Sequence, residues 1–365
     1  MKKLTLAAAV GSALLSMSMT ASAVTVPGPV DDSPWPTSQW GADDKAGSAN
    51  HTKNSANVKR ALSRVKQFKA ITVGKYYHRE IPAFGPRSWQ MTIPGTPTGG
   101  SFGKNALVYH DELLTTEIGQ IGTQFDGPGH IGINTSKGMM FYNQREAFAS
   151  YERGAGGRVL GMGPLGVEHV GELGFVCRLV VLDAVAYRKS QGKLSASEEM
   201  LPVPKKPGDI GIVTADDVKA MVKAQGLEEI GPGDCVALHT GQGNTWGNDR
   251  YKSLDSAKRA AARAKFAEGE PGFGIGACMY MAERNIALTM GDTSANDAQP
   301  GNEEPGMGAA VPCHTELQAK RGIWNLENVD TKSLIDAKVH EGAFVWAPLR
   351  IIGGTGSPAN PVVLY

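Results

Sequence analysis

Short apolar runs alternate with turn-forming segments along most of the chain, and their spacing predicts interleaved strands and helices. Strands are expected at residues 70–77, 179–182, 235–238 and 286–290. Helices are expected around 54–67, 214–225, 256–266, 277–284 and 313–321, where Thr214 and Asp217 have the spacing of a capping box and Gly322 ends the last helix. Interleaving of this kind predicts a mixed α/β fold.

Two segments rich in Pro and Gly interrupt this pattern. Residues 24–39 contain Val-Pro-Gly-Pro, Asp-Asp-Ser-Pro and Trp-Pro, which predicts an N-terminal arm laid over the domain or partly mobile. Residues 82–104 predict a long loop, and a binding loop is favoured there over a floppy insertion.

The first residues have the pattern of a secretory signal peptide. Lys2 and Lys3 precede an apolar stretch that ends in Ala21-Ser22-Ala23, so residues 1–23 are expected to be removed and the mature protein to be periplasmic or secreted. A membrane anchor is the rival interpretation, but Gly, Ser and Thr interrupt the stretch. Losing the two lysines takes the formal net charge from +1 to −1, which disfavours nucleic acid and anionic membranes as partners.

Four cysteines, Cys177, Cys235, Cys278 and Cys313, lie far apart without a C-x-x-C pair, which argues against a thiolate zinc site. Cys177 and Cys235 lie in apolar runs and are expected to be small buried hydrophobic residues rather than disulfide partners. Export would permit disulfides, and the sequence does not choose among the three pairings.

The segment from Gln120 to His130 is the clearest candidate for chemistry. Gln120, Gln124 and Asp126 can point to one side of an extended segment, and Gly122 lets the backbone approach closely. Their oxygen atoms suit Mn²⁺, Mg²⁺ or Ca²⁺. The alternative is that these side chains only satisfy hydrogen bonds of a tight loop.

The same segment, Glu117-Ile-Gly-Gln-Ile-Gly-Thr-Gln-Phe-Asp-Gly-Pro-Gly-His130, resembles the signature H-x-G-T-H-x-D-x-P-x-H of the cyclase family of metal-dependent hydrolases. That family includes bacterial kynurenine formamidase and isatin hydrolase. Trp40-Gly-Ala-Asp-Asp-Lys-Ala-Gly47, Gly233-Asp-Cys-Val-Ala-Leu-His-Thr-Gly241, Gly291-Asp-Thr293 and Gly353-Gly-Thr-Gly-Ser-Pro-Ala-Asn-Pro361 also resemble segments of the family.

The resemblance implies one swivelling β/β/α domain over residues 40–365, assembled into dimers or tetramers. It implies metal ligands at Gln120, Gln124, Asp126, His314 and Glu327, a proton-transferring His130, and a substrate-facing Phe84. Both histidines of the signature are glutamines here, and because amides bind transition metals more weakly than imidazole, manganese is favoured over zinc. The expected activity is metal-dependent hydrolysis of a small cyclic or linear amide. A lactone or ester hydrolase and a metal-free periplasmic binding protein are the alternatives.

The residues alone place the second half of this site less firmly. His314 and Glu327 are thirteen residues apart and cannot share one helix face, so Glu327 must lie on the next segment. Without the resemblance, the favoured interpretation is that Glu327 is an exposed charge on a strand and that His314 is a polar residue at the start of a helix. His78, His110 and His239 are further candidates for the pocket, although each is more typical of a structural histidine. Asp292 is expected to brace a loop.

Overall fold

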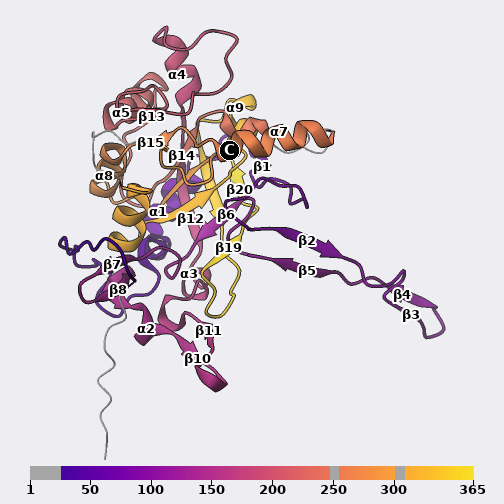
Figure 1. Cartoon of the computed structure of the whole chain (residues 1–365). Coiled ribbons are helices and arrows are strands. Elements are labelled where there is room, and N and C mark those ends of the chain that lie inside the picture. The colour runs from indigo at the N-terminus through magenta and orange to yellow at the C-terminus, as the bar shows by residue number, and fades with distance from the viewer. Residues whose placement is uncertain (1–25, 247–254, 301–308) are drawn as a thin grey trace, which may run out of the picture.

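The computed structural model describes residues 26–246, 255–300 and 309–365, and a nine-stranded sheet runs through its centre (Figure 1). The strand order is β1 (Ala70–Thr72), β20 (Val362–Leu364), β18 (Glu341–Trp346), β12 (Phe175–Asp183), β14 (Cys235–His239), β16 (Leu288–Gly291), β17 (Trp324–Glu327), β6 (Gln124–Asp126) and β19 (Gly356–Pro358). The four adjacent strands β12, β14, β16 and β17 are parallel, and the outer strands are antiparallel to their neighbours. The expected signal peptide, residues 1–23, lies outside the described residues.

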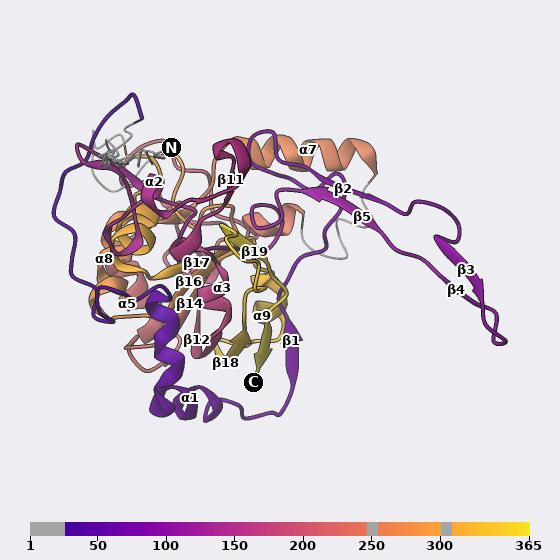
Figure 2. The same ribbon diagram turned by 90° about the horizontal axis from the view of Figure 1, so that it is seen from below.

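Helices cover both faces of this sheet (Figure 2). One face carries η1 (Gly47–Lys53), α1 (Ser55–Leu62), α3 (Glu168–Gly171) and α9 (Thr331–Asp336). The other carries α4 (Ala184–Ser190), α5 (Ala215–Ala224), α8 (Ile275–Glu283) and η6 (His314–Ala319). The other helices in the described residues are α2 (Ala147–Ser150), α7 (Ser256–Ala267), η2 (Tyr142–Gln144), η3 (Ala155–Gly157), η4 (Gly163–Leu165) and η5 (Gln242–Thr245).

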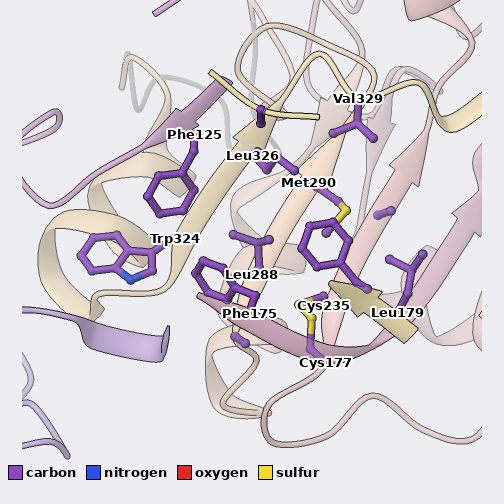
Figure 3. Close-up of a cluster of buried hydrophobic side chains, with 14 of the residues drawn as sticks. Phe125, Phe175, Cys177, Leu179, Cys235, Leu288, Met290, Trp324, Leu326 and Val329 are labelled. Carbon is purple, nitrogen blue, oxygen red and sulfur yellow. A yellow bond between two sulfur atoms is a disulfide. The ribbon is translucent and has the colours of Figure 1, made fainter. Parts of the chain in front are cut away.

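Strand β12 shows why the apolar run around residues 179–182 is continuous rather than alternating. Leu179 and Val181 pack into one core, and Val180 and Leu182 pack into the core on the opposite face. A strand with both faces covered needs apolar residues at every position. Figure 3 shows part of the first core, in which the rings of Phe125 on β6 and Trp324 on β17 lie 6.5 Å apart, centre to centre.

Most of the expected elements are present, and the mixed α/β fold is confirmed. The helix expected at 214–225 is α5, and both hydrogen bonds of the capping box between Thr214 and Asp217 form. The helix expected at 313–321 spans residues 312–321 and has π-helical hydrogen bonding at His314–Ala319. The strand expected at 70–77 is shorter, because β1 pairs with β20 only from Ala70 to Thr72. The helix expected at 54–67 ends at Leu62.

Two expectations were wrong. The loop expected at residues 82–104 contains β2 (Trp89–Thr92) and β3 (Gly99–Phe102), which pair with β5 (Leu113–Thr116) and β4 (Leu107–Tyr109) respectively to form a long projecting arm. Cys177 and Cys235 are buried as expected, but the four cysteines form two disulfides, Cys177–Cys235 and Cys278–Cys313. Cys177 and Cys235 lie on adjacent parallel strands, a proximity that sequence spacing does not reveal.

Smaller sheets complete the fold. A three-stranded sheet contains β7 (Ile133–Thr135), β8 (Gly138–Phe141) and β9 (Arg145–Glu146). Two pairs contain β10 (Glu152–Arg153) with β11 (Val159–Gly161), and β13 (Ile212–Val213) with β15 (Gly272–Phe273). Residues 26–39 lie against the three-stranded sheet, where Asn134 donates hydrogen bonds to the carbonyl oxygens of Val26 and Pro29. Within the described ranges, every helix is too short or too polar to cross a bilayer.

Candidate metal centre

The candidate site is built where β6 lies between β17 and β19. In this register Gln124 is opposite Glu327, and Asp126 is opposite both Asn325 and Gly356. The helix η6 precedes β17 and carries His314. Segments that are about two hundred residues apart in sequence therefore place their polar side chains together.

Asp126, His314 and Glu327 form the centre of the site, with ligand atoms that all lie within 4.8 Å of one another. His314 Nε2 is 3.0 Å from Glu327 Oε1 and 3.5 Å from Asp126 Oδ2. All three side chains are buried. One imidazole and two carboxylates at such distances are a donor set that divalent cations use.

Unpaired polar atoms favour an ion at this position. Neither oxygen of Asp126 has a hydrogen-bond partner, and both side-chain polar atoms of buried Gln120 are also without one. Buried polar groups in proteins are nearly always hydrogen-bonded, so unpaired buried oxygens of this kind are typical of a site that binds an ion. The residues present therefore fit a divalent cation.

The charges of the cluster favour a cation as well. In the described part of the chain, no Lys or Arg forms an ion pair with Asp126, Glu327 or the adjacent Asp297. Burial raises the pKa of Glu327 to about 8, and the negative charge of Asp126 adds to this effect. Burial would lower the pKa of His314, but its hydrogen bonds with Asp297 and Glu327 and the nearby carboxylate of Asp126 outweigh this effect and raise that pKa well above its ordinary value. The carboxylates thus attract positive charge into the site.

The two glutamines lie at the edge of the cluster in different ways. Gln124 Nε2 donates a hydrogen bond of 2.7 Å to Glu327 Oε2, which joins Gln124 directly to the cluster. The amide of Gln120 lies against Gly356, the strand neighbour of Asp126, where a side chain on residue 356 would clash with it. Gly122 has a φ of +69°, and a Cβ there would lie 2.6 Å from the ring of Tyr77, so glycine is required as the motif suggests.

His130 lies beside the cluster on the loop that follows β6. Its Nε2 is 3.7 Å from Asp126 Oδ2, and the side chain is largely buried but retains some exposure. Burial lowers the pKa of His130, and His314 and Arg87 act in the same direction against the opposing effect of Asp126. A neutral imidazole at the edge of a buried ion site can accept a proton from a reacting group.

Phe84 is not in the cluster. The residue is 71% exposed, and the centre of its ring lies 5.7 Å from the guanidinium carbon of Arg87. Arg87 in turn donates a hydrogen bond of 3.2 Å to the backbone oxygen of Gln120. Burial raises the pKa of Asp126 and lowers that of His130, and the positive charge of Arg87 lowers both pKa values. Phe84 therefore lies at the outer edge of the site, with Arg87 between it and the cluster.

The other histidines considered from the sequence have structural positions. His110 is exposed on the projecting arm, away from the cluster. His78 accepts a hydrogen bond from the backbone N–H of Glu80. His239 is buried and pairs with Thr331 Oγ1 at 2.7 Å. Asp292 braces a loop as expected, because it accepts hydrogen bonds from the backbone N–H groups of Thr240 and Gly241.

Sequence reasoning missed three residues of the site. Asp297 lies 2.7 Å from His314 Nδ1 and fixes the orientation of the ring, and Asn325 donates to Glu327 Oε1 at 2.9 Å. Asn325 is two residues before Glu327 on β17 and shares its face, so the period of a strand could have indicated it. Asp297 and Arg87 had no comparable signal. The interpretation of Glu327 as an exposed strand charge was wrong, since only 2% of the residue is exposed.

Comparison with known proteins agrees with this architecture. A family model described as "Putative cyclase" matches residues 37–298, and the chain belongs to this cyclase family. The crystal structure of a novel cyclase is similar with a TM-score of 0.69 and 23% identity, over 90% of this chain and 96% of that one. An isatin hydrolase bound to the product analogue thioisatinate has a TM-score of 0.52 and 18% identity, over 81% and 92% of the two chains. Isatin hydrolase A from Ralstonia solanacearum has a TM-score of 0.51 and 18% identity, over 85% of this chain and 94% of that one. These likenesses confirm the fold. A search of curated proteins finds no match.

Proposed function

We propose that this protein is an exported, divalent-metal-dependent hydrolase that cleaves a small cyclic or linear amide. The observation that carries the proposal is the buried cluster of Asp126, His314 and Glu327. Both side-chain oxygens of Asp126 lack a hydrogen-bond partner, and His130 Nε2 lies 3.7 Å from Asp126 Oδ2. The family membership and the isatin hydrolases among the similar structures support the same reaction class.

The side chains of the cluster would have different roles. Asp126, His314 and Glu327 would hold the ion, with Gln120 and Gln124 as additional amide donors, and Asp297 and Asn325 would keep the imidazole and carboxylate ligands in orientation. A bound divalent ion supplies Lewis-acid polarisation of the carbonyl and a water that is acidic at ambient pH. Because most of the donors are oxygen atoms, Mn²⁺ is preferred and Zn²⁺ is the second choice.

His130 is the catalytic residue of the proposal. It accepts a proton from the attacking water as the new C–O bond forms at the carbonyl carbon. It then donates that proton to the leaving nitrogen as the C–N bond breaks, so that the products are a carboxylate and an amine. A lactone would differ only in its leaving oxygen.

The test is to measure metal content and hydrolysis together. We expect Asp126→Ala to lose both the bound metal and turnover. His130→Ala should keep the metal and lose about 10²–10⁴-fold in kcat. Asp336→Ala, at an exposed position outside the site, is the control and should behave as the wild type. An Asp126→Ala protein that keeps both metal and activity would contradict the proposal.

A substrate panel of amides, imides, lactones and esters distinguishes the amide hydrolase from its lactone alternative. A purified wild-type protein that contains no metal, hydrolyses none of the panel and still binds one of its members would support the remaining alternative, a periplasmic binding protein. Export is supported by the residues of the signal-peptide pattern and by the two disulfides, since disulfides persist in oxidising compartments.

Arg87 suggests that the substrate carries a negative charge. Within the described residues its guanidinium forms no ion pair, although it is close enough to Asp126 and His130 to affect their pKa values. A substrate carboxylate could take that place. A charge-assisted hydrogen bond is worth about 1.5–3 kcal/mol, so we expect Arg87→Met to raise KM for a carboxylate-bearing substrate by roughly 10- to 100-fold. KM for a matched neutral amide should stay within about twofold, and an equal loss for both substrates would contradict this role.

A further inference from the structure

One of the two disulfides lies directly beside the candidate metal centre. Cys313 immediately precedes His314 where η6 begins, and it is bonded to Cys278 on α8. Both cysteines are buried in the core on the η6 side of the sheet. The other disulfide, Cys177–Cys235, joins β12 to β14, neither of which carries a proposed ligand (Figure 3). The two cross-links therefore differ in their relation to the site.

The Cys278–Cys313 bond closes a ring of contacts around the imidazole of His314. One carboxylate oxygen of Asp297 accepts a hydrogen bond from the backbone N–H of Cys313, and the other lies 2.7 Å from His314 Nδ1. Asp297 also forms a parallel β-bridge with Phe273 at the end of β15, and α8 begins directly after that strand. Cys278 on α8 then returns to Cys313 through the disulfide. A single covalent bond thus completes the frame that holds the imidazole and its carboxylate partner.

The backbone just before His314 is strained. Val311 has a φ of +40°, which is an outlier for a β-branched residue, and its carbonyl oxygen accepts a hydrogen bond from the N–H of His314. The hydrogen bonding from His314 to Ala319 is π-helical, a rare arrangement that is frequent at functional sites. A strained backbone persists only where the surrounding structure enforces it. The cross-link at Cys313, two residues after Val311, is such a constraint.

The packing around this frame leaves η6 some room to move. A small cavity of about 10 Å³ is lined by Cys278, Cys313, His314 and Gln318, among others. Gln318 lies one turn after His314 and is buried, yet neither of its side-chain polar atoms has a hydrogen-bond partner in the described part of the chain. Because these contacts do not anchor the helix, the disulfide is the contact that fixes where η6 begins.

We propose that the Cys278–Cys313 disulfide positions His314 for metal binding, so that the centre reaches its full affinity only after this bond has formed. The inference rests on the metal site of the proposed function. A ligand that is fixed before the ion arrives loses less conformational entropy on binding. Loss of a group that orients a metal ligand typically weakens metal binding by roughly 10- to 100-fold.

The cross-link also connects metal binding with export. Cys278 and Cys313 form their bond by thiol–disulfide exchange: one thiolate attacks the disulfide of an oxidant, the second displaces the oxidant's sulfur, and the oxidant leaves as a dithiol. In a reducing compartment both cysteines stay thiols. The chain would therefore hold its ion weakly until it reaches an oxidising compartment.

The test compares the two disulfides of the same chain. One variant carries Cys278→Ala and Cys313→Ala, and its matched control carries Cys177→Ala and Cys235→Ala. The Kd for Mn²⁺ is measured on metal-free protein by electron paramagnetic resonance of the free ion, and the free energy of unfolding by urea. We expect the first variant to bind Mn²⁺ roughly 10- to 100-fold more weakly than wild type.

The control separates positioning from general stability. Its disulfide closes a loop of 58 residues rather than 35, so its removal should reduce stability by at least as much. Its Kd for Mn²⁺ should nevertheless stay within about twofold of wild type, because Cys177 and Cys235 do not contact the site. A second site variant, Cys278→Val with Cys313→Ala, removes the bond but fills more of the buried volume, and it should show the same weakened binding.

The unmodified protein provides an independent measurement. Coupling between two equilibria is reciprocal, so saturating Mn²⁺ should shift the equilibrium between Cys278–Cys313 and its two thiols by the same factor of roughly 10 to 100 toward the disulfide. Cys177–Cys235 should shift by no more than about twofold. Equilibration with dithiothreitol, followed by alkylation and mass spectrometry, measures each pair separately.

Several results would overturn the positioning role. These are an equal change in Kd for Mn²⁺ in the two alanine variants, an unchanged Kd in both, or equal protection of the two disulfides by Mn²⁺. If the Cys278→Ala and Cys313→Ala variant does not fold, the valine-containing variant and the reduction equilibrium decide. A wild-type protein that binds no Mn²⁺ would instead contradict the proposed function, and the positioning role with it.

Discussion

Lys75 is a buried amine whose charge should reduce stability at neutral pH. Burial lowers its pKa from 10.5 to about 8, against the opposing effect of Asp292 and Asp330. Its Nζ donates one hydrogen bond of 3.2 Å to the backbone oxygen of Gly243 and lies 4.1 Å from the centre of the Trp246 ring. These contacts stabilise the ammonium only in part, so the folded chain holds this proton less tightly than the unfolded chain does.

The sign and size of the effect follow from this difference. Between pH 8 and 10.5 the unfolded chain binds a proton at this position that the folded chain has lost, so stability rises with pH in that window. Below pH 8 the full penalty is present, and a shift of about 2.5 pKa units corresponds to about 3 kcal/mol. From pH 7 to pH 9.5 the wild type should therefore gain about 2 kcal/mol from this one group.

The assay compares wild type and Lys75→Met by urea unfolding at both pH values and equal metal content. At pH 7 the variant does not bury an ammonium group, which stabilises it relative to the wild type. It also loses the hydrogen bond and the cation–π contact of Lys75, which reduces this gain in stability by about 2 kcal/mol. The change with pH is therefore the decisive quantity. The stability difference between the two proteins should move by about 2 kcal/mol in favour of the wild type at pH 9.5. Lys66→Met, at an exposed position, is the control, and its free energy of unfolding should change with pH as that of the wild type does. If the difference in free energy of unfolding between wild type and Lys75→Met is the same at both pH values, the reasoning is refuted.

Two further predictions concern the core. Arg178→Met should lower the free energy of unfolding by about 3–5 kcal/mol, because Asp234, only 1% exposed and 2.8 Å from Arg178 Nη1, would keep only Arg60 as an ion-pair partner. Urea unfolding checks this, and a loss below about 1 kcal/mol would contradict it. Replacing Cys177 and Cys235 together by Ala should cost about 4 kcal/mol for a loop of 58 residues, measured against wild type under non-reducing conditions. Equal stability of the two proteins would show that this disulfide adds nothing.

The sequence predicted those parts of the fold whose signals are local. The capping box of Thr214 and the apolar run of β12 each depend on neighbouring residues, and both elements form where expected. The arm formed by β2, β3, β4 and β5 was missed because its strands bury neither face and therefore lack the alternation that marks a half-buried strand. The connection between β2 and β3 also contains Pro94 and Pro97, which indicate a loop. The pairing of Cys177 with Cys235 depends on the order of strands in the sheet, which no spacing within the sequence reveals.

The candidate site divides in the same way. The contiguous motif from Gln120 to His130 indicated Asp126 and the neighbouring imidazole, and the family resemblance added His314 and Glu327. The cluster of three was then found in the structure, whereas the ligand roles remain predictions. Asp297 and Arg87 were missed because their proximity to the site comes from chain crossings far from the motif.

The insertion of β6 between β17 and β19 has a consequence for how the protein matures. Asp126 enters its final environment only after residues 324–327 and 356–358 have been added on either side, so the ion pocket does not exist on a growing or unfolded chain. Contacts of such long range form late and slowly. A cation that binds only the finished pocket would stabilise the folded state in proportion to RT ln(1 + [ion]/Kd), and a chelator would lower the unfolding temperature by withdrawing that contribution.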